Sequence, residues 1–199
     1  GLPGPALGRP RLQWPARLHV LPDMIVLEGA PALSPFRRDR LQARLQAIVP
    51  GLRVLGTWHG YWIQPDAGAA PDPAALRRIL QAQAQAQPAG AAPGATSRFV
   101  VPRLGTLSPW ASKATELLRG AGLPVHRVER GMRIDLAGWP DDAGRQAALA
   151  KLLHDPMTQS LLASREAGAA LFDAQPAGAL EVVPLDALQA ANARLGLAL

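Results

Sequence analysis

One order of local patterns occurs twice in this chain, and the repeat constrains the fold more than any other feature. The triplets Ser34-Pro35-Phe36 and Ser108-Pro109-Trp110 stand 74 positions apart. Each offers a serine N-cap followed by proline at the first helical position. A short apolar run precedes each triplet, and a helical pattern and a longer strand-like run follow it. The pattern predicts an internal duplication, with two α+β halves side by side.

The two halves are predicted over residues 24–87 and 97–154. Apolar and β-branched runs predict strands at 24–27, 52–64, 98–101 and 125–136, the first closed by a turn at 29–31. Apolar residues at spacings of three and four predict a helix after each of the two Ser-Pro pairs. Further helices are predicted after Asp72-Pro73 and from Asp141 or Asp142, and the Ala-Gln repeat at 81–87 is read as an exposed helical end.

The two flanks of the duplicated region follow other patterns. Residues 1–23 hold five prolines and three interspersed arginines, so they are predicted to be a disordered leader and lack the apolar stretch of a secretory signal. After residue 154, Asp155-Pro156 is expected to cap a helix, residues 180–183 to form a strand, and Asp186 to cap a last helix. The apolar end at 197–199 suggests a chain cut before its natural end, and Met24 is a plausible natural start.

Composition excludes several classes of chemistry. The chain has no cysteine, which excludes disulfides, thiolate metal sites and cysteine nucleophiles. Its four histidines are scattered and form no metal-ligand spacing, and no run approaches the ~18 apolar residues that cross a bilayer. The net charge is +6, yet the longest basic runs are only pairs, at 37–38 and 77–78. This footprint disfavours nucleic-acid binding. The alternative function is that of a free-standing basic α+β module that binds nucleic acid or another anionic partner.

The densest polar group lies around the second Ser-Pro pair, within residues 102–115. A helix N-terminus favours anions, and Lys113 near it opposes the helix dipole. Arg103, Ser108, Ser112, Lys113 and Thr115 can therefore surround a phosphate or the acidic surface of a partner. In the alternative reading, Ser108 or Ser112 caps the helix, Trp110 packs, and Lys113 is solvated.

Two further polar groups lie on predicted strands. Glu129 and Arg130 are adjacent, so they point to opposite faces of the strand and are expected to serve a structural or interface salt bridge. His59 stands between aromatic residues and is read as half-buried strand packing.

Five blocks of the chain, in one order, resemble the N-terminal region of the large single-chain phosphoribosylformylglycinamidine synthases of bacterial purine biosynthesis. The most specific block is Gly105-Thr106-Leu107-Ser108-Pro109-Trp110-Ala111-Ser112-Lys113-Ala114-Thr115, and the others lie at 27–37, 122–131, 152–155 and 191–199. The resemblance spans residues 24–199. Three positions depart from the family pattern: Pro156 replaces an arginine, Gly120-Ala121 replaces Asn-Cys, and residues 132–135 replace an aromatic strand.

The resemblance implies a fold and a role. The fold is α+β: a duplicated PurS-like module in residues 24–154, with an antiparallel sheet and helices on one side, followed by the start of a linker in 155–199. The whole enzyme is a cytoplasmic ligase that uses ATP, Mg²⁺ and glutamine to convert formylglycinamide ribonucleotide to its amidine. Its synthetase and glutaminase domains are the expected partners, with no nucleic acid or membrane, and this fragment is expected to be inactive alone and to bind no cofactor. A substrate-proximal or domain-docking role is expected for Arg103, Ser108, Trp110, Ser112, Lys113, Thr115, Glu129 and Arg130.

Overall fold

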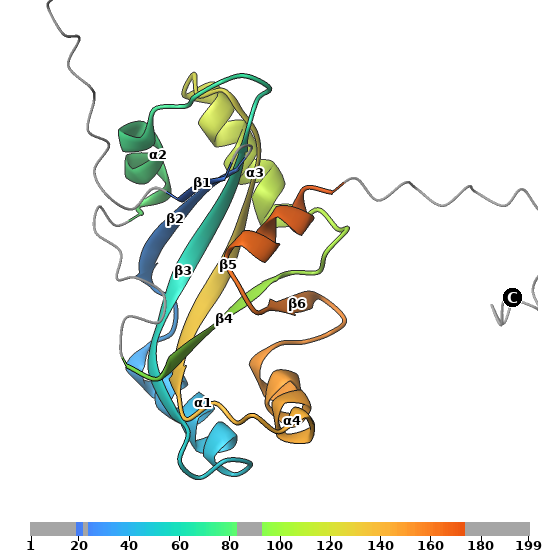
Figure 1. Ribbon diagram of the computed structural model, residues 1–199. Coiled ribbons are helices and arrows are strands. Elements are labelled where there is room, and N and C mark those ends of the chain that lie inside the picture. The colour runs from blue at the N-terminus through green and yellow to red at the C-terminus, as the bar shows by residue number, and fades with distance from the viewer. Residues whose placement is uncertain (1–18, 22–23, 83–92, 174–199) are drawn as a thin grey trace, which may run out of the picture.

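Six antiparallel strands form one sheet, in the order β1-β2-β3-β5-β4-β6 (Figure 1). The computed structural model describes residues 19–21, 24–82 and 93–173. The strands are β1 (His19–Leu21), β2 (Met24–Pro31), β3 (Arg53–Pro65), β4 (Ala95–Pro102), β5 (Val125–Ala137) and β6 (Gln159–Leu162). The helices are α1 (Pro35–Gln46), α2 (Pro73–Leu80), α3 (Pro109–Gly120), α4 (Ala143–Leu153) and the 3-10 helix η1 (Glu166–Leu171).

The predicted strand and helix order of both halves is present, each half running strand, helix, strand, helix. The two long strands β3 and β5 pair with each other at the middle of the sheet, where Gly60 lies opposite Gly131. The shorter strands β2 and β4 flank them on the outside. The two halves are therefore joined edge to edge around the β3 and β5 pair.

Helix starts follow the predicted capping chemistry. The Ser34 hydroxyl accepts a hydrogen bond from the Arg37 amide, and the Ser108 hydroxyl accepts one from the Ala111 amide. Asp72 and Asp142 cap α2 and α4 in the same way. Each cap satisfies an amide that the helix itself leaves without a partner, which confirms the predicted helix starts.

Helices α1 to α4 all cover one face of the sheet, which we call the helix face, and their core is shared between the halves. One apolar cluster packs α2 and α3 against residues such as Ile63 and Val128, and the other packs α1 and α4 against Val54 and Leu136. In Figure 1 these two helix pairs lie at opposite ends of the sheet. Because each pair takes one helix from each half, neither half has a core of its own.

The opposite face of the sheet is covered by the segment that follows α4. Leu162 of β6 and Leu171 of η1 pack with Trp62 and Phe99 in a third apolar cluster. Alternation along the strands explains the division, because successive side chains point to opposite faces. On β5, Ile134 and Leu136 therefore join the helix face, whereas Arg133 and Asp135 join the opposite one.

Several sequence predictions are corrected outside the duplicated core. Residues 159–162 form β6, which pairs with β4, instead of a helix capped by Asp155. The edge of the sheet offers open backbone groups to this segment, so residues predicted as linker from 155 complete the fold through Leu171. Strand β2 runs on through the turn predicted at 29–31, and β1 lies within the predicted leader. Helix α2 ends before Gln81, whose φ is 53°. The strand and helix predicted at 180–183 and from Asp186 lie outside the described residues, as do positions 83–87 of the Ala-Gln repeat.

Candidate functional site

A cavity of about 430 Å³ opens on the helix face at the centre of the molecule, and we call it the central cavity. It lies where the second half meets the first, beside the residues that lead into α1 and the cap of α3. No Asp or Glu is among the described residues that line it. The lining consists of Ala32, Leu33, His59, Val100, Val101, Pro102, Ser108, Arg130, Gly131, Met132, Thr158 and Gln159.

Arg130 supplies the charge of the central cavity. Its guanidinium lies 4.8 Å from the ring centre of Trp110, and Trp110 lies 6.0 Å from Tyr61, ring centre to ring centre. A cation over an aromatic face is attracted by the π electrons, so Trp110 holds the arginine side chain in place. Arg130 is exposed and forms no salt bridge with any carboxylate of the described chain.

His59 faces the same cavity as a neutral group. Burial lowers the pKa of its imidazole, and the positive charge of Arg130 lowers it further, while a backbone hydrogen bond involving Gly131 opposes the change. Burial raises the pKa of the nearby Tyr61 hydroxyl. At neutral pH the arginine is therefore the one cation among these three side chains.

Glu129 and Arg130 point to opposite faces, and Glu129 pairs with a different arginine. Its fully buried carboxylate lies 2.6 Å from Nη2 of Arg127 and accepts a hydrogen bond of 2.8 Å from the Ser108 hydroxyl. Arg127 also donates to the carbonyl of Thr106 at 2.7 Å. This network ties the loop before α3 to the edge of β5, which β4 leaves uncovered beyond Met132.

The remaining predicted site residues divide into two groups. Thr115 is used internally, because its hydroxyl accepts a hydrogen bond from the Val128 amide at 3.1 Å. Ser112 and Lys113 are exposed on α3. Arg103 is exposed on the loop after β4, where it donates to the carbonyl of Met157 at 3.4 Å. Only Ser108 and Arg130 of the predicted set line the central cavity, so the predicted group is not one compact anion site.

A buried charge cluster on the opposite face was missed by sequence reasoning. Arg133 forms ion pairs with Glu28 and with Asp135, and Arg165 approaches the same Glu28 oxygen at 2.6 Å. Burial raises the pKa of the Glu28 carboxyl, and the charges of Arg133 and Arg165 oppose that rise. The spacing of Arg133 and Asp135 places both on one strand face, but their burial depends on the segment that was predicted to be a linker.

The described residues contain neither a metal-ligand cluster nor a membrane-spanning helix. No group of three His, Cys, Asp or Glu side chains gathers there to hold a metal ion. No helix of the described ranges is long and apolar enough to cross a membrane.

Fold and site together define a class of protein: a duplicated antiparallel α+β module with an arginine-centred cavity where its halves meet. The family model described as "Formylglycinamide ribonucleotide amidotransferase N-terminal" matches residues 58–172, which is more than half of the chain. The chain belongs to this family. It is the N-terminal portion of a phosphoribosylformylglycinamidine synthase, a ligase of purine biosynthesis. The family's enzyme depends on ATP and has further domains in the same polypeptide.

Proposed function

We propose that this chain is a non-catalytic assembly module of the synthase. In this role it binds the synthetase part of its own polypeptide and leaves ATP binding, glutamine hydrolysis and amidation to the other domains. The observation that carries the proposal is Arg130, an exposed and unpaired cation among the described residues, at the centre of the helix face. Such a group is solvated while it is exposed, and an opposite charge on a partner steers docking toward it.

The proposed docking surface consists of exposed residues on α3, on β5 and on the loop after β4. Arg103, Ser112, Lys113 and Arg130 are exposed, and Trp110 supports Arg130. Ser108, Thr115 and Glu129 shape this surface from within, because their polar atoms hold α3 and its preceding loop against β5. The proposed surface therefore carries three exposed cations, Arg103, Lys113 and Arg130.

ATP, Mg²⁺ and glutamine belong to the activity of the whole enzyme. Mg²⁺ prefers carboxylate and phosphate oxygens, and the described residues bring no three acidic or histidine side chains together. We therefore propose that the residues that hold these groups belong to the other domains of the enzyme. A cytoplasmic location is consistent with the purine-biosynthesis family and is part of the proposal. The alternative, a free-standing module for nucleic acid, is not supported by the family match.

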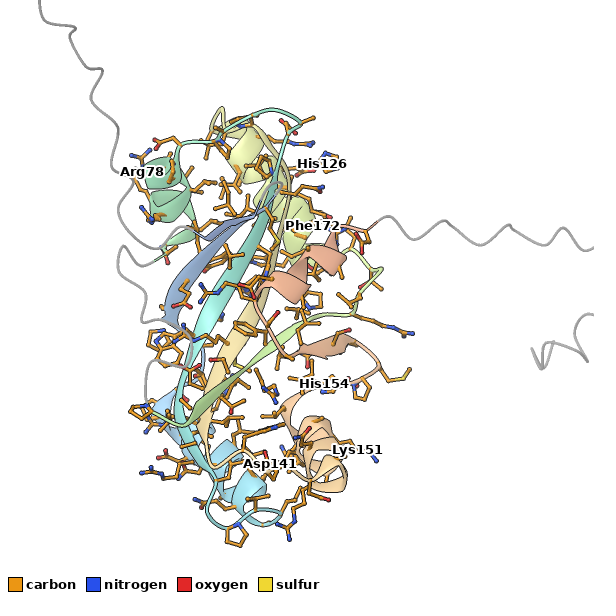
Figure 2. The ribbon with its side chains drawn as sticks, viewed as in Figure 1. Arg78, His126, Asp141, Lys151, His154 and Phe172 are labelled. Carbon is orange, nitrogen blue, oxygen red and sulfur yellow. The ribbon has the colours of Figure 1, made fainter. Side chains whose placement is uncertain are left out.

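Charge reversal in the complete synthase tests the proposal. Lys113→Glu is expected to lower glutamine-dependent amidation several-fold, because an exposed cation at an interface steers and stabilises docking. Lys151→Glu is the matched control, since Lys151 is an exposed lysine on α4 (Figure 2). The isolated chain is expected to show no ligase activity. Equal activity of the two variants, or full activity of a synthase lacking residues 1–173, would contradict the proposed role.

A further inference from the structure

Resting on the proposed assembly role, we infer that the central cavity receives an acidic segment of the synthetase part, with a carboxylate of that segment bound to the guanidinium of Arg130. The inference rests on the placement of Arg130, the charges around it and the lining of the cavity.

The guanidinium of Arg130 is fixed in a position where a planar anion can reach it. The ring of Trp110 supports one face of the guanidinium at 4.8 Å, and the rim of the cavity leaves the group exposed. A guanidinium presents parallel N–H donors that match the two oxygens of a carboxylate. The acid next to it in the chain, Glu129, does not neutralise it, because Glu129 is fully buried and bound by Arg127 and Ser108.

The charges around the cavity favour an anion, although the Asp155 carboxylate accepts a hydrogen bond of 3.2 Å from Thr158, which lines the cavity. The described lining has no acidic residue, and the first turns of α1 and α3, which begin beside it, have none either. The first turn of α1 carries the partial positive charge of a helix N-terminus, whereas that of α3 is already met by Glu129, which accepts hydrogen bonds from the amide and the hydroxyl of Ser108. Arg37 and Lys113 add full charges close to these two turns. A neutral His59 adds none of its own. Charge complementarity therefore favours an acidic occupant.

The lining favours a peptide segment over a small anion. Ala32, Leu33, Val100 and Met132 contribute apolar surface, and Thr158 and Gln159 contribute polar groups. A volume of about 430 Å³ exceeds what one carboxylate group fills, and an apolar lining around a few polar groups is typical of sites that bury side chains. The other domains of the same polypeptide are the available source of such a segment.

A zero-length cross-link in the complete synthase tests this inference directly. The variant Arg130→Lys keeps the charge and introduces an amine, which a carbodiimide joins to a contacting carboxylate as an amide. Peptide mass spectrometry then identifies the acid. Arg78→Lys is the control, because Arg78 is exposed on α2 at the end of the molecule away from α1 and α4 (Figure 2).

The expected result is a cross-linked peptide that joins position 130 to an Asp or Glu outside residues 1–199, absent from the Arg78→Lys protein. Cross-links from position 130 to acids within residues 1–199 alone would overturn the inference. If the peptide that contains position 130 is recovered without any cross-link, the site takes a small anion instead of a protein segment. That result would overturn the inference as well.

Charge reversal separates this inference from the assembly role. Arg130→Glu is expected to lower glutamine-dependent kcat/KM by about tenfold or more, because an uncompensated charge at an interface is costly, whereas Arg78→Glu leaves it unchanged. If deleting the module abolishes activity but Arg130→Glu behaves like Arg78→Glu, the acidic-segment inference fails and the assembly role stands. If deletion leaves activity intact, the assembly role fails.

Discussion

The indole Nε1 of Trp62 donates a hydrogen bond of 3.0 Å to the backbone carbonyl of Arg165, across 103 positions of sequence. Trp62 is fully buried in the middle of β3, and Arg165 immediately precedes η1. The indole fits because glycine stands at three contacts: Gly60 on the same strand, Gly131 on the neighbouring strand and Gly168 in η1. This contact fixes the segment after α4 to the sheet, together with the ion pair between Arg165 and Glu28.

Replacing Gly168 tests how much of the fold depends on this contact. A Cβ at position 168 would lie 2.1 Å from Nε1 of Trp62, so Gly168→Ala must displace η1 or the indole. We expect the free energy of unfolding to fall by about 2 kcal/mol or more, the sum of overpacking and a lost hydrogen bond. Gly51→Ala is the control, because nothing lies within 4 Å of a Cβ there. Denaturant unfolding measures both, and equal midpoints would contradict the prediction.

The duplicated triplets provide a matched pair of aromatic residues. Trp110 lies between Tyr61 and Arg130, whereas Phe36, at the same place in the first half, is 73% exposed. We expect Trp110→Ala to lower the free energy of unfolding by about 1–3 kcal/mol, since a half-buried indole loses part of the full core value. Phe36→Ala should stay within about 0.5 kcal/mol. Thermal unfolding measures the loss of stability in both variants. A larger loss for Phe36→Ala than for Trp110→Ala would contradict the packing role of Trp110.

The duplicated core was predictable because its signals are local. Serine and aspartate caps, proline at the first helical positions and apolar periodicity each depend on a few neighbouring residues, so the helix starts after Ser34, Asp72 and Ser108 follow from the sequence. Residues 159–171 escaped prediction because their structure depends on distant partners. Strand β6 pairs with the edge of β4. The 3-10 helix η1 begins directly after Arg165, the residue that Trp62 and Glu28 bind.

The candidate site was predictable only in part, for the same reason. Strand alternation alone places Glu129 and Arg130 on opposite faces. The partner of Glu129 is set by the path of the loop before α3, which brings Ser108 to its carboxylate. The central cavity requires both halves to meet, so His59 could not be assigned to the same site as Arg130 from spacing in either half.

The lowered pKa of His59 predicts a pH dependence of stability. The unfolded chain takes up a proton near the ordinary value of 6.5, whereas the folded chain takes it up at a lower pH, because of burial and the charge of Arg130. Between these two values the unfolded state binds more protons, so stability falls as the pH drops below about 6.5. Denaturant midpoints from pH 7.5 to pH 5 measure the fall. His59→Gln should lessen it, and an unchanged slope in that variant would exclude His59 as its source.

The shared core predicts that the two halves fold only in association. Leu118 of α3 packs in one cluster with Leu76 and Leu80 of α2, and Leu149 of α4 packs in the other with Leu45 of α1. Separation would expose both clusters and the long pairing edges of β3 and β5. We expect residues 19–82 and 93–173, produced as separate chains, to show no cooperative unfolding as monomers. Mixing them should restore a cooperative transition and a 1:1 complex, measured by circular dichroism and sedimentation. A monomeric half that unfolds cooperatively would show that its core is its own.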